Sequence, residues 1–106
     1  FVGANVNYAG EPALAPLVGT KLVRSHVASV AGERVGIVGI MVPNLASISS
    51  PGGVTVDPNV VASVQAEVDA LRFDPVNPVN KIIVMGQQQA ITNDLAMIPQ
   101  LRGVDV

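Results

Sequence analysis

The pattern of hydrophobic and polar residues predicts strands in the first part of the chain. Residues 1–6 are mostly apolar and read as a short strand, and residues 21–30 alternate between two faces, as a half-buried strand does. Residues 34–42 are apolar on both faces, which predicts a fully buried strand that pairs with 21–30 in a β-hairpin. Gly36 and Gly39 would weaken this strand unless another part of the chain packs close to its backbone.

A long loop and a clearly marked helix follow. Residues 44–57 are rich in Ser, Pro and Gly, and a loop of this length is often functional. Asp57 and Pro58 suit a helix start, because aspartate can accept hydrogen bonds from free helix amides and proline fits the first turn. The next apolar residues recur at helical spacing and predict a helix that faces a core; they are Val61, Val64, Val68 and Leu71.

The last part of the chain adds a strand, a helix and a further strand. Residues 81–85 read as a short buried strand, and a second helix from about Thr92 would turn Leu95 and Ile98 inward. Residues 104–106 read as the beginning of one more strand. This order predicts an α/β fold with a β-hairpin and two helices.

The predicted fold also indicates where a site would lie. Ligands in α/β folds gather at the carboxyl ends of strands. The positions of interest are therefore the loop after Val42 and the turn at Gly86–Gln89. Pro51-Gly52-Gly53, inside the long loop, is too short and unspecific for a phosphate-binding loop.

Composition narrows the functions that the chain can have. Hydrophobic residues make up 49% of the 106 residues and charged residues 13%, against about 25% charged residues in an average domain. A chain with so little charge to cover its surface is expected to pack against more protein. The net charge is −2 and the six Lys and Arg residues are scattered, so binding to a nucleic-acid polymer is not expected.

Cysteine and membrane signals are absent from the sequence. Without cysteine, disulfides, thiolate metal sites and a cysteine nucleophile are excluded. The longest apolar stretch, Val35–Val42, is too short to span a bilayer. Phe1 opens directly into strand-like sequence with no signal peptide, as a mature or internal piece would.

Five stretches, in order along the chain, carry a resemblance to one protein family. They are Phe1–Val6 (FVGANV), Val35–Ile40 (VGIVGI), Ser50–Pro58 (SPGGVTVDP), Lys81–Gln87 (KIIVMGQ) and Leu101–Val106 (LRGVDV). In sequence and spacing they resemble the 5′-nucleotidase type of calcineurin-like metallophosphoesterase, and the resemblance spans essentially the whole chain.

The resemblance implies that residues 1–106 are the C-terminal half of a catalytic domain and part of a four-layer α/β/β/α sandwich. The family hydrolyses phosphate esters with two divalent metal ions, which clamp the phosphate and activate water. Its Asp-x-His, Gly-Asp and Asn-His-Glu motifs would lie before Phe1, and its Gly-His-x-His motif after Val106. No metal is therefore expected to bind this chain alone, and its partners would be the remainder of its domain and a phosphate-ester substrate.

One metal ligand of the family should fall inside the chain. It is the histidine after the Lys81–Met85 strand, and this chain has Gln87 at that position. A Gln carbonyl oxygen is a poorer ligand for a transition metal than imidazole. Gln87 is either a weak metal or phosphate contact or a turn amide that bonds to nearby backbone, and the second interpretation is favoured.

The other polar candidates are favoured as structural residues. Asn5 is expected to form hydrogen bonds at a strand end rather than to support a site. His26, the only histidine, is expected to be an exposed or half-buried strand residue, and Asp57 is expected to cap the helix. No serine has a His or Asp at a spacing that suggests a nucleophile. The methionines, Met41, Met85 and Met97, are expected to fill the core.

Two functions remain open. In the first, the chain belongs to an exported phosphoesterase (extracellular, periplasmic or at the cell surface) that hydrolyses nucleotides or related phosphate esters, and the segment alone is inactive. In the second, the same scaffold is a non-catalytic structural or interaction domain, which Gln87 and the low charge favour. A free-standing small-molecule binding module ranks last, because no polar cluster converges in the sequence.

Overall fold

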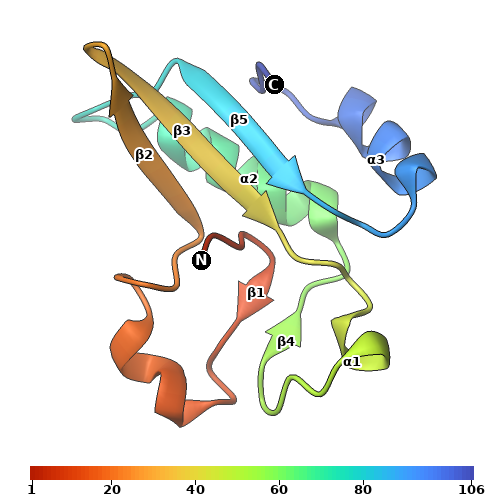
Figure 1. Cartoon of the computed structure of the whole chain (residues 1–106). Helices are drawn as coiled ribbons and strands as arrows, with labels where there is room; N and C mark the ends of the chain where they lie inside the picture. The colour runs from red at the N-terminus through yellow and green to blue at the C-terminus, as the bar shows by residue number, and fades with distance from the viewer.

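A computed structural model describes all residues, 1–106, as a mixed α/β arrangement with two small sheets (Figure 1). One sheet pairs β1 (Val6–Asn7) with β4 (Thr55–Val56), and the other has the strand order β2 (Ser25–Val30), β3 (Glu33–Ile40) and β5 (Lys81–Gly86). The helices are α1 (Leu45–Ile48), α2 (Val60–Arg72) and α3 (Ile91–Met97), with 3₁₀ turns η1 (Pro12–Leu17) and η2 (Ile98–Gln100).

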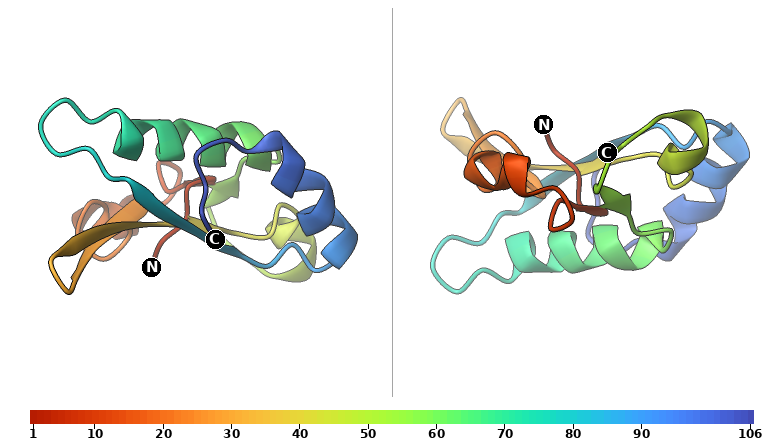
Figure 2. Two further views of the ribbon diagram at one scale, coloured as in Figure 1. Left: turned by 90° about the horizontal axis from the view of Figure 1, so that it is seen from above. Right: turned by 90° about the horizontal axis from the view of Figure 1, so that it is seen from below.

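The sheet of β2, β3 and β5 is the framework of the molecule. β2 and β3 pair antiparallel as the predicted hairpin, with Ala31 and Gly32 in the left-handed conformation at its turn. β3 and β5 pair in parallel, with Ile37 beside Ile83. α2 connects these two strands and lies along one face of the sheet (Figure 2). A parallel pair with its crossover helix confirms the α/β class, whereas the four-layer sandwich stays a prediction.

The core lies between α2 and the sheet. Val64 and Val68 of α2 are fully buried, as are Val38 of β3 and Ile82 of β5. Burial of each such side chain stabilises the fold by about 1.5–3 kcal/mol. The predicted inward stripe of the helix is thus confirmed, and its other two members pack half-buried against this core.

The two glycines of β3 lie where other parts of the chain come close. A Cβ atom on Gly36 would lie 2.9 Å from the side-chain ends of both Ile82 and Leu71. A Cβ atom on Gly39 would collide with the main-chain carbonyl of Val2. The expectation that something packs close to this backbone is therefore confirmed.

The predicted N-terminal strand over residues 1–6 is wrong in extent. Val2 forms a single bridge to Val23, and only Val6–Asn7 belong to a strand. The chain turns at Ala4 toward β3, where the Ala4 amide donates to the Gly39 carbonyl over 2.8 Å. The predicted loops also contain short regular elements. Residues 7–16 include most of η1, and residues 44–57 include α1 and β4.

Three predictions of burial are wrong. β3 is not buried on both faces, since Ile37 is only half-buried, and Met85 of β5 is 53% exposed rather than a core filler. The face of the sheet opposite α2 is covered only in part by this chain. Leu95 of α3 and Ile98, the first residue of η2, are 60% and 61% exposed, and Met97 is the residue that faces the core.

α2 begins later than predicted, and Asp57 does not cap it. The helix starts at Val60, and the Asn59 side chain accepts a hydrogen bond from the Ala62 amide over 3.2 Å. Asp57 instead accepts from the Asn59 amide over 2.8 Å and from the Ser63 hydroxyl over 3.0 Å. The capping prediction fails because Asp57 first closes a turn with the residue two positions on, as aspartate often does.

Residues 104–106 are not assigned as a strand, but they dock on the free edge of β5. The Val106 amide donates to the Ile82 carbonyl over 3.2 Å, and the Val84 amide donates to the Val106 carbonyl over 2.7 Å. Two such bonds around Ile83 are the pattern of a parallel pair. The C-terminal segment therefore lies where the sequence predicts the next strand.

Candidate functional site: the carboxyl edge of the sheet

The carboxyl ends of β3 and β5 lie at the same edge of the sheet because the two strands are parallel. After β3 the chain passes Pro43, and after β5 it turns at Gln87–Gln89. Pro43 and Gln88 line one hollow of about 330 Å³, together with Asn59 beside α2 and Asn93 of α3. The two positions that the sequence indicates as a site therefore meet in the structure.

Asn5 holds the end of β3 in place. Its side chain is buried, and it donates to the Met41 carbonyl over 2.8 Å and accepts from the Met41 amide over 2.9 Å. Its main-chain carbonyl accepts from the Asp57 amide over 2.7 Å. The hydrogen-bonding role predicted for Asn5 is confirmed, and one residue ties β1, the end of β3 and the approach to α2 together.

Gln88 holds the turn after β5. It is 8% exposed, and its amide nitrogen donates to the Asp94 carboxylate over 2.8 Å and lies 3.8 Å from the Met97 sulfur. The Asn93 side chain donates to the Gln88 carbonyl over 3.5 Å. These contacts attach the turn to α3, and Gln89 follows with a left-handed φ of 66°.

Gln87 is exposed directly after β5. Its side chain forms no hydrogen bond to nearby backbone, so the favoured interpretation as a turn amide is wrong. Its role as a metal or phosphate contact stays a prediction. Strand alternation explains why it differs from Gln88, because residues 82, 84, 86 and 88 share the phase that faces α2. The alternation of the strand, continued two residues beyond Gly86, identifies Gln88 as the buried glutamine. The sequence analysis did not predict this role for Gln88.

The donors at this edge do not fit a dinuclear metal centre by themselves. No group of three or more His, Cys, Asp or Glu side chains in the chain is placed to hold a metal ion. The only histidine, His26, is exposed on β2 beside Ile37, as the sequence predicts, and not at the edge. Neutral amides such as those of Gln87 and Asn93 bind transition metals less well than imidazole or carboxylate.

A larger hollow, of about 760 Å³, lies elsewhere. It is lined by the loop after β1, including Tyr8, and by Arg24 and Asp57, and it includes no part of the turn after β5. The Tyr8 hydroxyl is buried there without a hydrogen-bond partner, and burial raises the pKa of this phenol. Arg24 is occupied by an ion pair with Glu67 at 3.2 Å.

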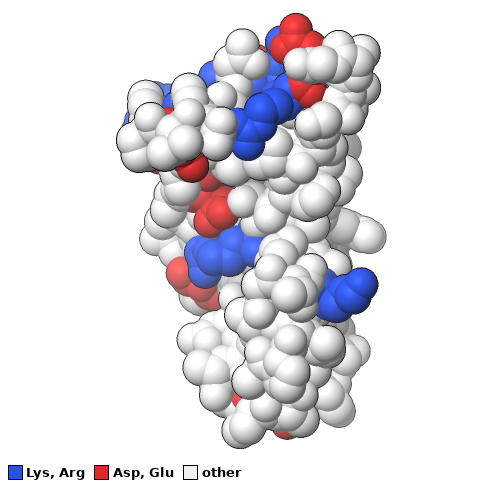
Figure 3. All heavy atoms as spheres, turned by 90° about the vertical axis from the view of Figure 1, so that its left-hand side faces the viewer, with Lys and Arg blue, Asp and Glu red and all other residues white.

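Charged side chains of both signs are dispersed on one face of the molecule. On the face shown in Figure 3, residues of both signs are interspersed on a mainly uncharged surface. The hydrogen bond from Lys81 lowers the pKa of Glu33, and the amides of Asn77 and Val76 lower the pKa of Asp74. Both carboxylates lie at or before the amino ends of the strands, so neither can serve as an acid or base at the carboxyl edge.

The fold and this edge describe a mixed α/β chain with two small sheets. Its similarity to known proteins indicates the family that it resembles. No protein-family profile matches the chain. The chain is 37% identical to 5′-nucleotidase from Rattus norvegicus and 35% identical to that from Mus musculus, in each case over all 106 residues. It spans 17% of the length of each of these proteins.

Solved structures give the same result. Over 98% of this chain, a 5′-nucleotidase precursor from Thermus thermophilus superposes with a TM-score of 0.82 and 36% identity, and the match covers 19% of that protein. NAD nucleotidase from Haemophilus influenzae superposes with a TM-score of 0.73 and 25% identity, again over 19% of its length. The resemblance to the 5′-nucleotidases is confirmed, and the chain corresponds to a segment of these proteins.

Proposed function

We propose that the chain is part of a metal-dependent phosphoesterase that hydrolyses nucleotides or related phosphate esters. The observation that carries this proposal is the 37% identity to a 5′-nucleotidase along the entire chain. The superposition on a second 5′-nucleotidase with a TM-score of 0.82 supports it from the backbone alone. The substrate class follows from what these relatives are named for.

Within that protein, residues 1–106 would be the C-terminal half of the catalytic domain, in a four-layer α/β/β/α sandwich. Its main partner would be the remainder of the same domain. Support comes from apolar side chains that this chain leaves uncovered, including Val30 and Met85 on the sheet and Leu95 on α3, each more than half exposed. In the complete domain, further protein would cover these large apolar side chains.

The metal site would be completed by residues outside this segment. Two divalent metal ions would be held mainly by the rest of the domain, with Gln87 as one weak ligand or phosphate contact at the carboxyl edge. Asn5 and Gln88 would keep the two strand ends in place, because each holds one of them through buried hydrogen bonds. The segment alone would bind no metal and would be inactive.

Gln87 favours a second candidate, a non-catalytic structural or interaction domain on the same scaffold. A neutral amide at the position of a histidine ligand weakens a metal site without disturbing the fold, because the Gln87 side chain is exposed. Both candidates would act outside the cytoplasm or at the cell surface. The relative named as a precursor supports export. None of the helices here is long and apolar enough to cross a membrane.

The test is phosphate release from adenosine monophosphate by the complete protein. We expect release with Mn²⁺ or Zn²⁺ and none after chelation of the metal. Absence of release with every divalent metal tried, from protein whose circular dichroism shows it to be folded, would favour the non-catalytic scaffold.

A further inference from the structure

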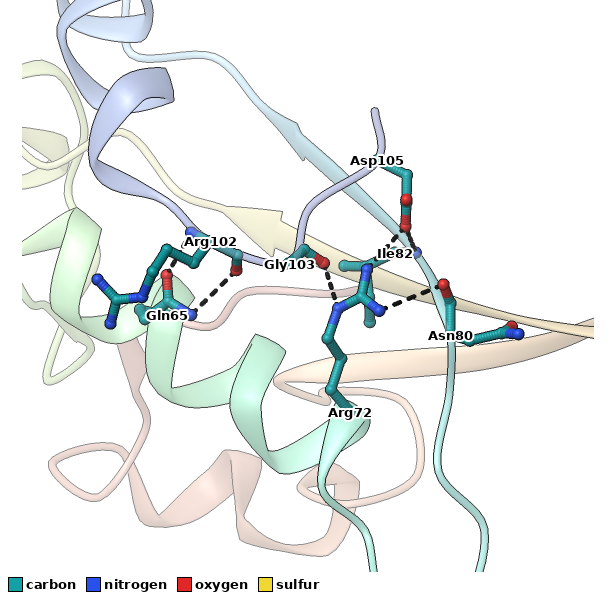
Figure 4. A network of polar contacts seen from close by, with 7 residues as sticks. All are labelled: Gln65, Arg72, Asn80, Ile82, Arg102, Gly103 and Asp105. Carbon is teal, nitrogen blue, oxygen red and sulfur yellow. Dashed lines mark hydrogen bonds and ion pairs between the residues drawn. The ribbon is translucent and has the colours of Figure 1, made fainter.

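The C-terminal segment Arg102–Val106 is held by side chains of α2 as well as by β5 (Figure 4). The Gln65 side chain accepts from the Arg102 amide over 2.8 Å and donates to the Arg102 carbonyl over 3.1 Å. The Arg72 guanidinium donates to the Gly103 carbonyl through Nε and to the Asp105 carboxylate through Nη2 at 3.0 Å. One helix therefore contacts the segment at three of its residues.

Asp105 links these helix contacts to the sheet. The carboxylate oxygen that pairs with Arg72 also accepts from the Ile82 amide over 2.8 Å. The Asp105 amide in turn donates to the Ile82 carbonyl over 2.9 Å. Arg72 also donates to the Asn80 carbonyl over 3.3 Å, so it contacts the chain just before β5 as well as the docked segment.

Gly103 is shaped for the same contact. Its φ is +77°, in the left-handed region that favours glycine, and a Cβ atom there would lie 2.6 Å from Nε of Arg72. The segment can therefore approach the guanidinium only with glycine at this position. The contact therefore depends on α2, on β5 and on the C-terminal segment together, and not on a single pair of surface residues.

We propose that Arg72 and Asp105 form a register lock that fixes which residue of the C-terminal segment lies beside Ile83. A shift by one residue would place a valine against the guanidinium and turn Asp105 the other way, because side chains alternate along an extended segment. The Asp105 carboxylate would then lose both of its hydrogen-bond donors, the Arg72 guanidinium and the Ile82 amide. A carboxylate turned away from both donors is costly, so the lock rejects the neighbouring registers.

The lock has a consequence for the sheet edge. The segment runs parallel to β5, toward the carboxyl edge that carries Gln87, so its register sets where its continuation meets that edge. Only this consequence rests on the proposed function. The lock itself is a property of the fold and is measured without any activity.

Hydrogen exchange of the complete protein tests the lock. Arg72→Lys keeps the charge but loses the planar guanidinium that makes several hydrogen bonds at once. Protection of the Ile82 and Val84 amides from exchange should then fall about tenfold or more, because hydrogen bonds to charged groups are stronger than neutral ones. Amides of the β2–β3 hairpin should not change. Arg24→Lys, which alters another arginine that pairs with α2, is the matched control and should leave all these amides unchanged.

A second variant keeps the proposal testable if Arg72→Lys does not fold. Gly103→Ala should give the same selective loss at Ile82 and Val84, because it displaces Arg72 without changing any charge. Unchanged protection in the folded variants, or an equal loss in the hairpin and in Arg24→Lys, would overturn the register lock. A failure of the phosphatase assay would leave these exchange results as they are, so the two proposals fail separately.

Discussion

Asn5 and Met41, 36 positions apart in the sequence, exchange two hydrogen bonds of 2.8 and 2.9 Å between one side chain and one backbone unit. The Asn5 side chain pairs with the backbone of Met41 as a neighbouring strand would. It does so just after β3, where the hydrogen bonding between β3 and β5 has ended. One buried side-chain amide thus holds the end of β3 in place at the carboxyl edge of the sheet.

Replacing Asn5 by alanine should lower the free energy of unfolding by about 2–4 kcal/mol, because the amide and carbonyl of Met41 both lose their partner away from water. Urea denaturation measures the change. Asn44→Ala is the control, since Asn44 is exposed and makes no capping hydrogen bond, and it should stay within about 0.5 kcal/mol of the parent. An equally small effect of Asn5→Ala would contradict the structural role.

The two glycines of β3 should differ in their tolerance of a methyl group. Gly39→Ala should destabilise by about 3 kcal/mol or more, because the new Cβ meets the main chain of Val2. Gly36→Ala should cost about 1 kcal/mol, because it meets side chains and no main chain, with the movable ends of Ile82 and Leu71 nearest. Thermal or urea denaturation of both variants decides the order, and a reversed order would show that Val2 does not cross at Gly39.

Asp74 should make the stability depend on pH in the acid range. The amides of Asn77 and Val76 hold the pKa of this carboxyl below its ordinary value of 3.8 in the folded chain. A carboxyl whose pKa is lowered by folding stabilises the fold above its unfolded pKa and loses that effect as pH falls through its folded pKa. Asp74→Asn should therefore be less stable than the parent at pH 7, and the difference should vanish below the folded pKa. A difference that persists unchanged once the pH is below that pKa would refute this assignment.

Gln87→His should strengthen metal binding in the complete protein. An imidazole in place of the amide gives the edge a better transition-metal ligand, and we expect Mn²⁺ or Zn²⁺ to bind about tenfold more tightly. Isothermal titration measures the affinity. Ala70→His, which adds a histidine to an exposed position on α2, controls for binding to a stray surface imidazole. Equal affinities in the two variants would remove Gln87 from the metal site.

Local patterns predicted the parts of the fold that depend on neighbouring residues. The hairpin, the stripe of α2 through Val64 and Val68 and the strand at Lys81–Gly86 follow from periodicity, and all three are present. The N-terminal strand failed because Ala4 bonds to Gly39, a contact between distant segments that no local pattern encodes.

Burial was harder to predict than secondary structure. Leu95 and Ile98 have the spacing of an inward face, yet α3 turns Met97 to the core, because it sits at the end of the sheet and is tied there through Gln88. The loop after β3 and the turn after β5, which the sequence indicates as positions of a site, do meet in one hollow at the sheet edge. Which of two adjacent glutamines is buried depends on the strand phase, and the predicted strand ends at Met85, before this phase reaches Gln88.

The account depends most on where the catalytic groups reside, and phosphate release is the direct measurement. Complete protein and isolated residues 1–106 would be compared at equal concentration, with Mn²⁺ or Zn²⁺ and adenosine monophosphate. We predict metal-dependent release by the complete protein and none by the isolated residues, since these contain no cluster of metal-binding side chains. Sustained release by residues 1–106 alone, abolished by chelation, would contradict it.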